Sequence, residues 1–219
     1  MKIRTFTKRL NATELGKGAT NDTYVAIPNE VDLSSMFENN VAMTIEDSRS
    51  GQVYVPATSN IKYTQTGQNN QERISGLGEY FRKSLADVGD EIVFERHEDS
   101  AGNVKYYLNL VHRDVIVLQK GKTYAEIIRS GALPQYVIDN NYRIDVFYRG
   151  GKCTLDILFK ETSKKKKTSP STTDFYDLVI DGNSILSDFT YQDYIEVDIK
   201  SKQLDRMLTY TEHIMEWRD

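Results

Sequence analysis

The chain has 219 residues, which is enough for one large domain or two small ones. Hydrophobic residues make up 39% and charged residues 27% of the sequence, a balance typical of globular proteins that excludes wholesale disorder. Lysine and arginine (28) are outnumbered by aspartate and glutamate (32), so the formal net charge is −4, unlike that of strongly basic nucleic-acid-binding proteins.

Residue types that build disulfides and metal sites are scarce. Cys153 is the single cysteine, so the chain cannot form an intrachain disulfide or a cysteine-rich zinc site. The three histidines are far apart in sequence and lack metal-ligand spacing. The first residues contain no apolar signal-peptide segment, and no run approaches the roughly 20 apolar residues of a membrane-spanning helix. We therefore expect a soluble, cytoplasmic protein without a metal site.

Short segments in which apolar and polar residues alternate dominate the first half of the chain. This period of two predicts half-buried β-strands. The spacing of Phe81 and Leu85 predicts a helix at residues 78–85, and a second apolar stripe predicts another at 123–129. The strands are expected at residues 3–9, 23–27, 40–46, 52–55, 61–65, 91–97, 105–110 and 115–119.

The second half contains the clearest hairpin of the chain, at residues 142–160. Gly150 and Gly151 lie between its two alternating arms and supply the positive φ that a tight turn needs. Cys153 faces inward on the second arm, which favours a small core residue over a nucleophile. The next elements are expected to be a hairpin at residues 175–180 and 183–189 and a strand at 194–200.

The last apolar stripe of the chain follows helical spacing and predicts a closing amphipathic helix that packs on the core. With the preceding elements it predicts a mainly β fold with short helices, divided into a first domain of residues 1–119 and a smaller α+β domain of residues 120–219. The stripe consists of Leu204, Met207, Leu208, Thr211, Ile214 and Met215.

A polar stretch at residues 162–173 contains four consecutive lysines, at 164–167. Such a run is most often a solvated loop, and we favour that interpretation. The alternative is an arm that contacts nucleic-acid phosphates.

Two loops of the first half have unusual composition. Residues 14–23 lead directly into an expected strand, and residues 62–75 concentrate amides together with Glu72 and Arg73. Asparagine or glutamine can pair with adenine, arginine with guanine, and glutamate with the amino group of cytosine. The second loop therefore has the chemistry to read base edges, although composition alone favours a solvated loop.

Taken together, these two loops resemble a known family. Residues 9–28, with Gly18-Ala-Thr20 followed by Ile27-Pro28, resemble the opening of the EcoRII-type restriction endonuclease effector domain. Arg73-Ile-Ser-Gly-Leu-Gly78 is similar to that family's Arg-Ile-Thr-x-x-Gly segment. The resemblance covers roughly residues 1–118 and implies a B3-like fold, a seven-stranded open β-pseudobarrel. The sequence departs from the family at Gly76 and Leu77, where the family has arginine and tryptophan, so we expect a different recognition site.

The resemblance implies sequence-specific recognition of double-stranded DNA, with two loop arms in the major groove. Lys8, Arg9 and Lys62 would contact phosphates, which position the duplex without reading it. No cofactor is expected for this binding. The arm residues it implies are Lys17, Thr20, Asn21 and Asp22 on the first loop, and Tyr63, Gln65, Gln68, Asn69, Asn70, Gln71, Glu72 and Arg73 on the second.

Two alternatives remain open. Asp181 followed by Asp198 and Lys200 loosely fits a PD-(D/E)xK nuclease core, which would make the chain a small Mg²⁺-dependent type II restriction endonuclease. The simpler interpretation of the second half is an accessory domain that links the reader to a nuclease or motor subunit. The other alternative is a carbohydrate- or protein-binding β domain unrelated to DNA.

Overall fold

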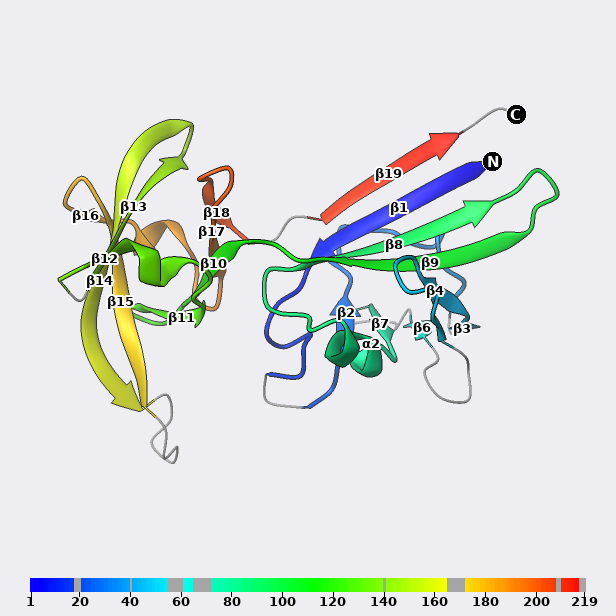
Figure 1. Ribbon diagram of the computed structural model, residues 1–219, viewed down its shortest axis with the longest axis horizontal. Coiled ribbons are helices and arrows are strands. Elements are labelled where there is room, and N and C mark those ends of the chain that lie inside the picture. Colours follow the sequence, from blue (N-terminus) through cyan, green and yellow to red (C-terminus); the bar gives the residue numbers. More distant parts are fainter. Residues whose placement is uncertain are drawn as a thin grey trace. The chain divides into compact units, whose positions relative to one another are not determined.

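The computed structural model describes residues 1–17, 21–39, 41–54, 61–64, 72–139, 141–164, 172–207 and 210–216. The chain forms two compact units (Figure 1). Unit 1 comprises Met1–His112 and Thr209–Asp219, and unit 2 comprises Arg113–Leu208. The division therefore falls earlier than the expected boundary at residue 119, and the end of the chain returns to unit 1. Unit 2 is thus an insertion between two segments of unit 1.

Unit 1 contains two sheets that enclose one core. The first is mostly antiparallel and has the strand order β19-β1-β8-β9-β4-β5, and the second is antiparallel with the order β2-β7-β6-β3. Phe6, Phe94 and Leu108 lie opposite one another in the first sheet and meet Val25 and Ile74 of the second sheet in the core. The first sheet consists of β19 (Tyr210–Glu216), β1 (Lys2–Arg9), β8 (Glu91–Glu98), β9 (Val104–Val111), β4 (Ile45–Asp47) and β5 (Val53–Tyr54). The second consists of β2 (Tyr24–Ala26), β7 (Arg73–Ser75), β6 (Ile61–Thr64) and β3 (Ala42–Met43).

Helix α2 (Gly78–Lys83) follows β7 and buries Tyr80 and Phe81 in the same core. The expected helix at this place is confirmed, but Leu85 lies beyond its end and is 81% exposed. Leu85 therefore does not share the buried face of Phe81, as the helical spacing had suggested.

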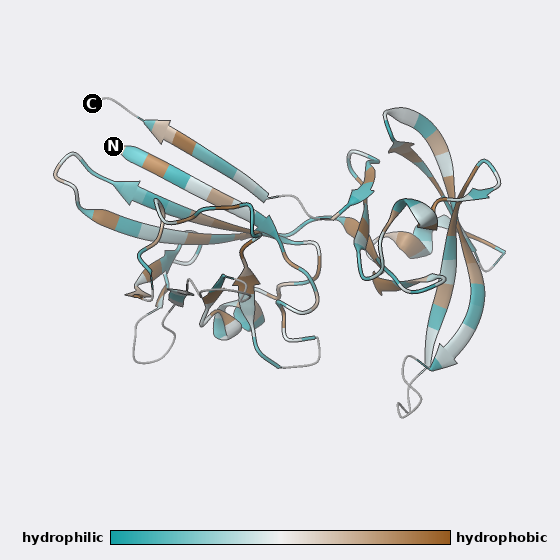
Figure 2. Cartoon of the chain, turned by 180° about the vertical axis from the view of Figure 1, so that it is seen from behind, coloured by the Kyte–Doolittle hydropathy of each residue, from teal (hydrophilic) through white to brown (hydrophobic). Residues whose placement is uncertain are grey.

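Unit 2 is a nine-stranded antiparallel sheet with the order β12-β13-β14-β15-β11-β10-β17-β18, to which β16 adds beside β15. Figure 2 shows hydrophobic and hydrophilic residues alternating along its strands, as a sheet with one buried face requires. The strands are β10 (Val115–Lys120), β11 (Ala125–Arg129), β12 (Val137–Ile138), β13 (Asn141–Tyr148), β14 (Gly151–Lys164), β15 (Thr172–Ile180), β16 (Asn183–Ser184), β17 (Tyr194–Asp198) and β18 (Leu204–Arg206), with 3₁₀ turns η1 (Leu133–Tyr136) and η2 (Leu186–Asp188).

The predicted hairpin of unit 2 is present as β13 and β14. Its turn lies one residue earlier than expected, because Tyr148 pairs with Gly151 and the two loop residues are Arg149 and Gly150. Both have positive φ, 50° and 80°, as a type I′ turn requires. Cys153 is half-buried opposite Val146, in agreement with the predicted inward face.

The mainly β fold with short helices is confirmed, but two predicted helices are strands. Residues 125–129 form β11, which pairs with β10 and β15. The expected closing helix is replaced by β18 and β19, and β19 pairs along its whole length with β1. In the described part of unit 2 the only helical segments are 3₁₀ turns, so the expected α+β domain is corrected to an all-β one.

The apolar stripe at the end of the chain is divided between the two units. Leu204 and Met207 are buried in unit 2, as expected of core residues, whereas Ile214 and Met215 of β19 are 54% and 47% exposed. The backbone of β19 finds its hydrogen-bond partners in β1 rather than within a helical turn. Among the described residues, no helix has the length and hydrophobicity needed to cross a membrane.

Candidate functional site

The small sheet of unit 1 brings the two unusual loops together. The first loop runs into β2, and the second connects β6 to β7, which is the strand between β2 and β6. Tyr24, Ser75 and Lys62 are directly opposite one another across the three strands. Because paired residues of antiparallel strands point to the same side, these three side chains share one face of the sheet.

The two faces of this sheet differ in character. Val25, Ile74 and Tyr63 form the inner row, and each is at most 1% exposed. Arg73, which is exposed, lies on the outer face, with its guanidinium carbon 4.6 Å from the centre of the Tyr24 ring. This distance is within the range of a cation–π interaction, which orients the guanidinium.

A hollow of about 370 Å³ lies beside this Arg73–Tyr24 pair. Asn21 and Asp22, both exposed, border it from the first loop, and Ser75 and Gly76 border it from the end of β7. Arginine, amide, carboxylate and hydroxyl groups thus converge at one place on the surface. Its remaining lining residues are Thr23, Tyr24 and Arg73.

Glu14 anchors the base of the first loop. Its carboxylate is 1% exposed and accepts hydrogen bonds from the backbone N–H of Ala26 at 2.7 Å and of Asn11 at 2.9 Å. Leu15 and Thr23 form a bridge across the loop. The two ends of the loop are therefore held together and joined to β2.

Lys8 supplies the counter-charge to Glu14. Its ammonium forms an ion pair with Oε1 of Glu14, and Lys8 is only 7% exposed. Because this charge is taken up inside the fold, Lys8 is not a phosphate contact, which corrects the expectation from sequence. Arg9 is half-buried and lies 3.4 Å from the carboxylate of Glu91.

The base of the second loop is held in a similar way. The hydroxyl of Tyr63 donates a hydrogen bond of 2.5 Å to Glu72, whose backbone carbonyl accepts one of 2.9 Å from Ile27 N–H. Burial and the neighbouring Glu72 carboxylate raise the pKa of Tyr63 above its usual range. Tyr63 is thus a core residue, which corrects the expectation that it contacts DNA. One oxygen of Glu72 accepts the Tyr63 hydroxyl, and a role of Glu72 in DNA contact stays a prediction.

Of the other DNA contacts predicted from the sequence, Lys62 and Lys17 are exposed and six lie outside the described residues. Lys62 is exposed on the outer face, and Lys17 is exposed and forms an ion pair of 2.7 Å with Asp87. Tyr24 and Ser75 were not among the site residues predicted from the sequence, although strand alternation around the buried Val25 and Ile74 places both on the outer face. The predicted contacts Thr20, Gln65, Gln68, Asn69, Asn70 and Gln71 lie outside the described residues.

The proposed nuclease residues are not brought together. Asp181 is in the turn after β15, with a φ of 51°, and Asp198 is the last residue of β17. Three antiparallel pairings separate these strands, so β15 and β17 run in opposite directions and end on opposite sides of the sheet. Arg113 binds Asp198 at 2.7 Å, and Lys200 is exposed in the following turn. The predicted Mg²⁺ site is therefore not formed by these residues.

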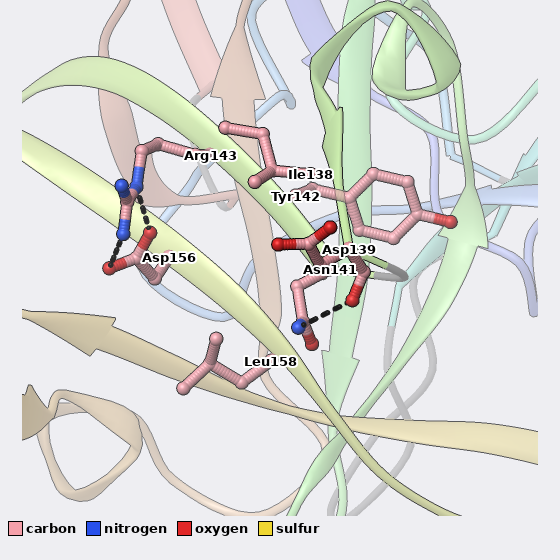
Figure 3. A pocket seen from close by; sticks show the side chains of 7 residues that line it. All are labelled: Ile138, Asp139, Asn141, Tyr142, Arg143, Asp156 and Leu158. Atoms are coloured by element: carbon pink, nitrogen blue, oxygen red, sulfur yellow. Dashed lines mark hydrogen bonds and ion pairs between the residues drawn. The ribbon is translucent and has the colours of Figure 1, made fainter.

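A second hollow, of about 250 Å³, lies in unit 2 between β12, β13 and β14 (Figure 3). Two of its three charged residues, Arg143 and Asp156, are joined by two hydrogen bonds of 2.6 and 3.2 Å. Asn141 donates to the carbonyl of Asp139 and accepts from Phe159 N–H. The polar side chains of Arg143, Asp156 and Asn141 bond within the protein, which favours a structural role for these three residues.

Comparison with known proteins found no matching protein family and no matching curated sequence. Among solved structures, the Arabidopsis FUS3–DNA complex matches with 14% identity and a TM-score of 0.36, covering 48% of this chain and 94% of that chain. The N-terminal domain of Helicobacter pylori LlaJI.R1 matches with 12% identity and a TM-score of 0.32, covering 51% of this chain and 82% of that chain. At these TM-scores neither likeness supports an argument about function.

Proposed function

We propose that unit 1 recognises double-stranded DNA in a sequence-specific manner, as a B3-like reader in a restriction system. In this proposal the loops at residues 14–23 and 63–75 are two arms that enter the major groove. The restriction context and the EcoRII-type relationship are supported by the resemblance in sequence. Unit 2 is then an accessory domain, and cleavage belongs to a separate nuclease or motor subunit.

The observation that carries this proposal is the meeting of both loops on the outer face of one small sheet. The guanidinium of exposed Arg73 lies over the Tyr24 ring there, with its carbon 4.6 Å from the ring centre, and we propose that its N–H donors face the ligand. An arginine can form two hydrogen bonds with guanine, and Asn21 and Asp22 beside it can pair with adenine and cytosine. These residue types are the ones that distinguish base pairs.

The charge distribution is consistent with a reader of this kind. Lys62, on the same face two positions along the neighbouring strand, can bind a phosphate and so position the duplex. The net charge of −4 limits sequence-independent attraction, because that term depends on the number of phosphates neutralised. We therefore propose modest non-specific affinity, with specificity arising from a few base contacts.

The test begins with selection of bound duplexes from a random pool. Arg73→Ala is expected to cost about 1–3 kcal/mol and to relax the preference at one base position, whereas Lys62→Ala is expected to weaken all sequences alike and to lower the salt slope by about 1. Arg49, in the turn between β4 and β5, and Lys105 on β9 are exposed and provide matched controls. If no duplex is preferred at moderate salt, or if Arg73→Ala and Lys62→Ala change every sequence equally, the proposed reading role is refuted.

A further inference from the structure

The end of helix α2 is built in an unusual way. Ala86 N–H donates to Phe81 O at 3.0 Å and Leu85 N–H donates to Arg82 O at 3.4 Å, which is the pattern of a Schellman motif. In this motif the residue after the C-cap adopts the left-handed conformation that glycine prefers. Leu85 occupies that position with a φ of 55°, so the backbone is strained by its side chain.

Leu85 is also exposed, and the combination is exceptional within the described part of the chain. The other non-glycine residues with positive φ there are all polar, as turn residues usually are. A leucine at this place gains little from burial, because it is 81% exposed, and it strains the backbone. Strain that folding does not require points to a functional reason for the side chain. The polar residues are Asp139, Arg149, Asp181, Gln192 and Lys202.

A hollow of about 430 Å³ adjoins Leu85. Leu15, Phe81 and Ala86 supply its apolar lining, and Lys17 and Arg82 are exposed at its border. Asp87 is also part of the lining, but its carboxylate forms an ion pair with Lys17, so these two charges cancel. Arg82 then gives the lining of the hollow a net positive charge.

This hollow adjoins the candidate reading surface at Thr23. Thr23 lines both this hollow and the one beside Arg73 and Tyr24. Gly78, at the start of α2, permits the close approach, because a Cβ at this residue would lie 2.7 Å from the Thr23 hydroxyl oxygen. The base of the first loop is therefore the common border of the two hollows.

We propose that the hollow at the end of α2 extends the DNA interface and that Leu85 packs against the duplex. The inference rests on the proposed function. The shared border at Thr23 and the positive charge of Arg82 favour DNA as the occupant. An apolar side chain can pack against a thymine methyl group or deoxyribose. Leu85 then contributes affinity through apolar contact, while Arg82 attracts the phosphate backbone.

Leu85→Gly provides the test, because stability and binding are expected to change in opposite directions. Glycine removes the left-handed strain, so the Tm is expected to rise by about 2–4 °C. The affinity for the selected duplex is expected to fall about 5–10-fold, because the apolar contact of the leucine side chain is lost. Leu85→Met keeps an apolar side chain and is expected to bind within about twofold of the wild type.

Gln192→Gly is the matched control, since Gln192 has a φ of 73° but lies in unit 2. It is expected to leave DNA affinity unchanged. If the wild type binds the selected duplex and Leu85→Gly binds it equally well, the inference is overturned and the hollow serves another partner. If the wild type binds no duplex, the proposed function itself is refuted and this inference with it. If Leu85→Met loses as much affinity as Leu85→Gly, apolar contact is not the cause and the inference is also overturned.

Discussion

The buried carboxylate of Glu14 provides a test of how the first loop is anchored. Its three partners, the Lys8 ammonium and the backbone N–H groups of Asn11 and Ala26, are all hydrogen-bond donors. Glu14→Gln keeps the size of the side chain but removes its charge and replaces one acceptor oxygen with an NH₂ group. One donor then faces another donor, and Lys8 loses its counter-charge.

The expected magnitude follows from burial. Removing one partner of a buried ion pair costs about 3–5 kcal/mol, because the remaining charge is left uncompensated. Lys8 is 7% exposed, so water cannot replace the carboxylate unless the loop base opens. We expect Glu14→Gln to lower the free energy of unfolding of unit 1 by about 3–5 kcal/mol.

Urea denaturation followed by circular dichroism measures this loss. Lys17→Met is the matched control, because the Lys17–Asp87 pair has side chains that are 53% and 42% exposed and is expected to contribute less than about 1 kcal/mol. Combining Lys8→Met with Glu14→Gln should recover part of the stability, since no unpaired buried charge remains. A loss below about 1 kcal/mol in Glu14→Gln would refute the assignment of Glu14 as the anchor.

The remaining predictions concern the reading face and acid stability. Tyr24→Leu removes the aromatic ring beneath Arg73 and should weaken binding of the selected duplex about 2–5-fold in fluorescence titrations. Tyr24→Phe keeps the ring and should bind normally. Equal losses in the two variants would contradict the cation–π role. Burial raises the pKa of Asp198, but hydrogen bonds from Ser201 and the charge of Arg113 outweigh it and hold the pKa below the usual value. Asp198 therefore stabilises the fold above the unfolded-state pKa of about 3.9, and this contribution is lost as the pH falls toward the lower folded-state pKa. Asp198→Asn should show a shallower loss of stability over this acidic range in pH-dependent urea titrations, and an unchanged slope would refute the linkage.

Local patterns in the sequence identified most strands and the two loops of interest. Alternation around Phe6, Phe94 and Leu108 corresponds to the paired core row of the first sheet, and the Gly150 region forms the expected tight turn. These features could be predicted because the period of a strand and the φ of a turn depend on residues close together in the chain.

The site was only partly predictable. Lys62 and Arg73, which the resemblance implied as DNA contacts, lie on the outer face, but Lys8 and Tyr63 are internal. A lysine in a strand has the same local pattern whether its partner is a phosphate or a buried carboxylate. Glu14 becomes the partner of Lys8 only when the base of the first loop packs against β1 and β2.

The last residues of the chain show most clearly that local sequence patterns do not determine long-range strand pairing. Leu204 and Ile214 have helical spacing, yet they lie in strands of different units. Composition, alternation and turn residues predicted a mainly β protein with two polar loops, because each of these properties depends on residues close together in the chain. Pairing of β19 with β1, separation of Asp181 from Asp198, and convergence of both loops on β7 arose from contacts between residues distant in sequence. Such contacts depend on which strand edges and buried charges still lack partners once the rest of the chain has folded. The periodicity of the sequence does not contain this information.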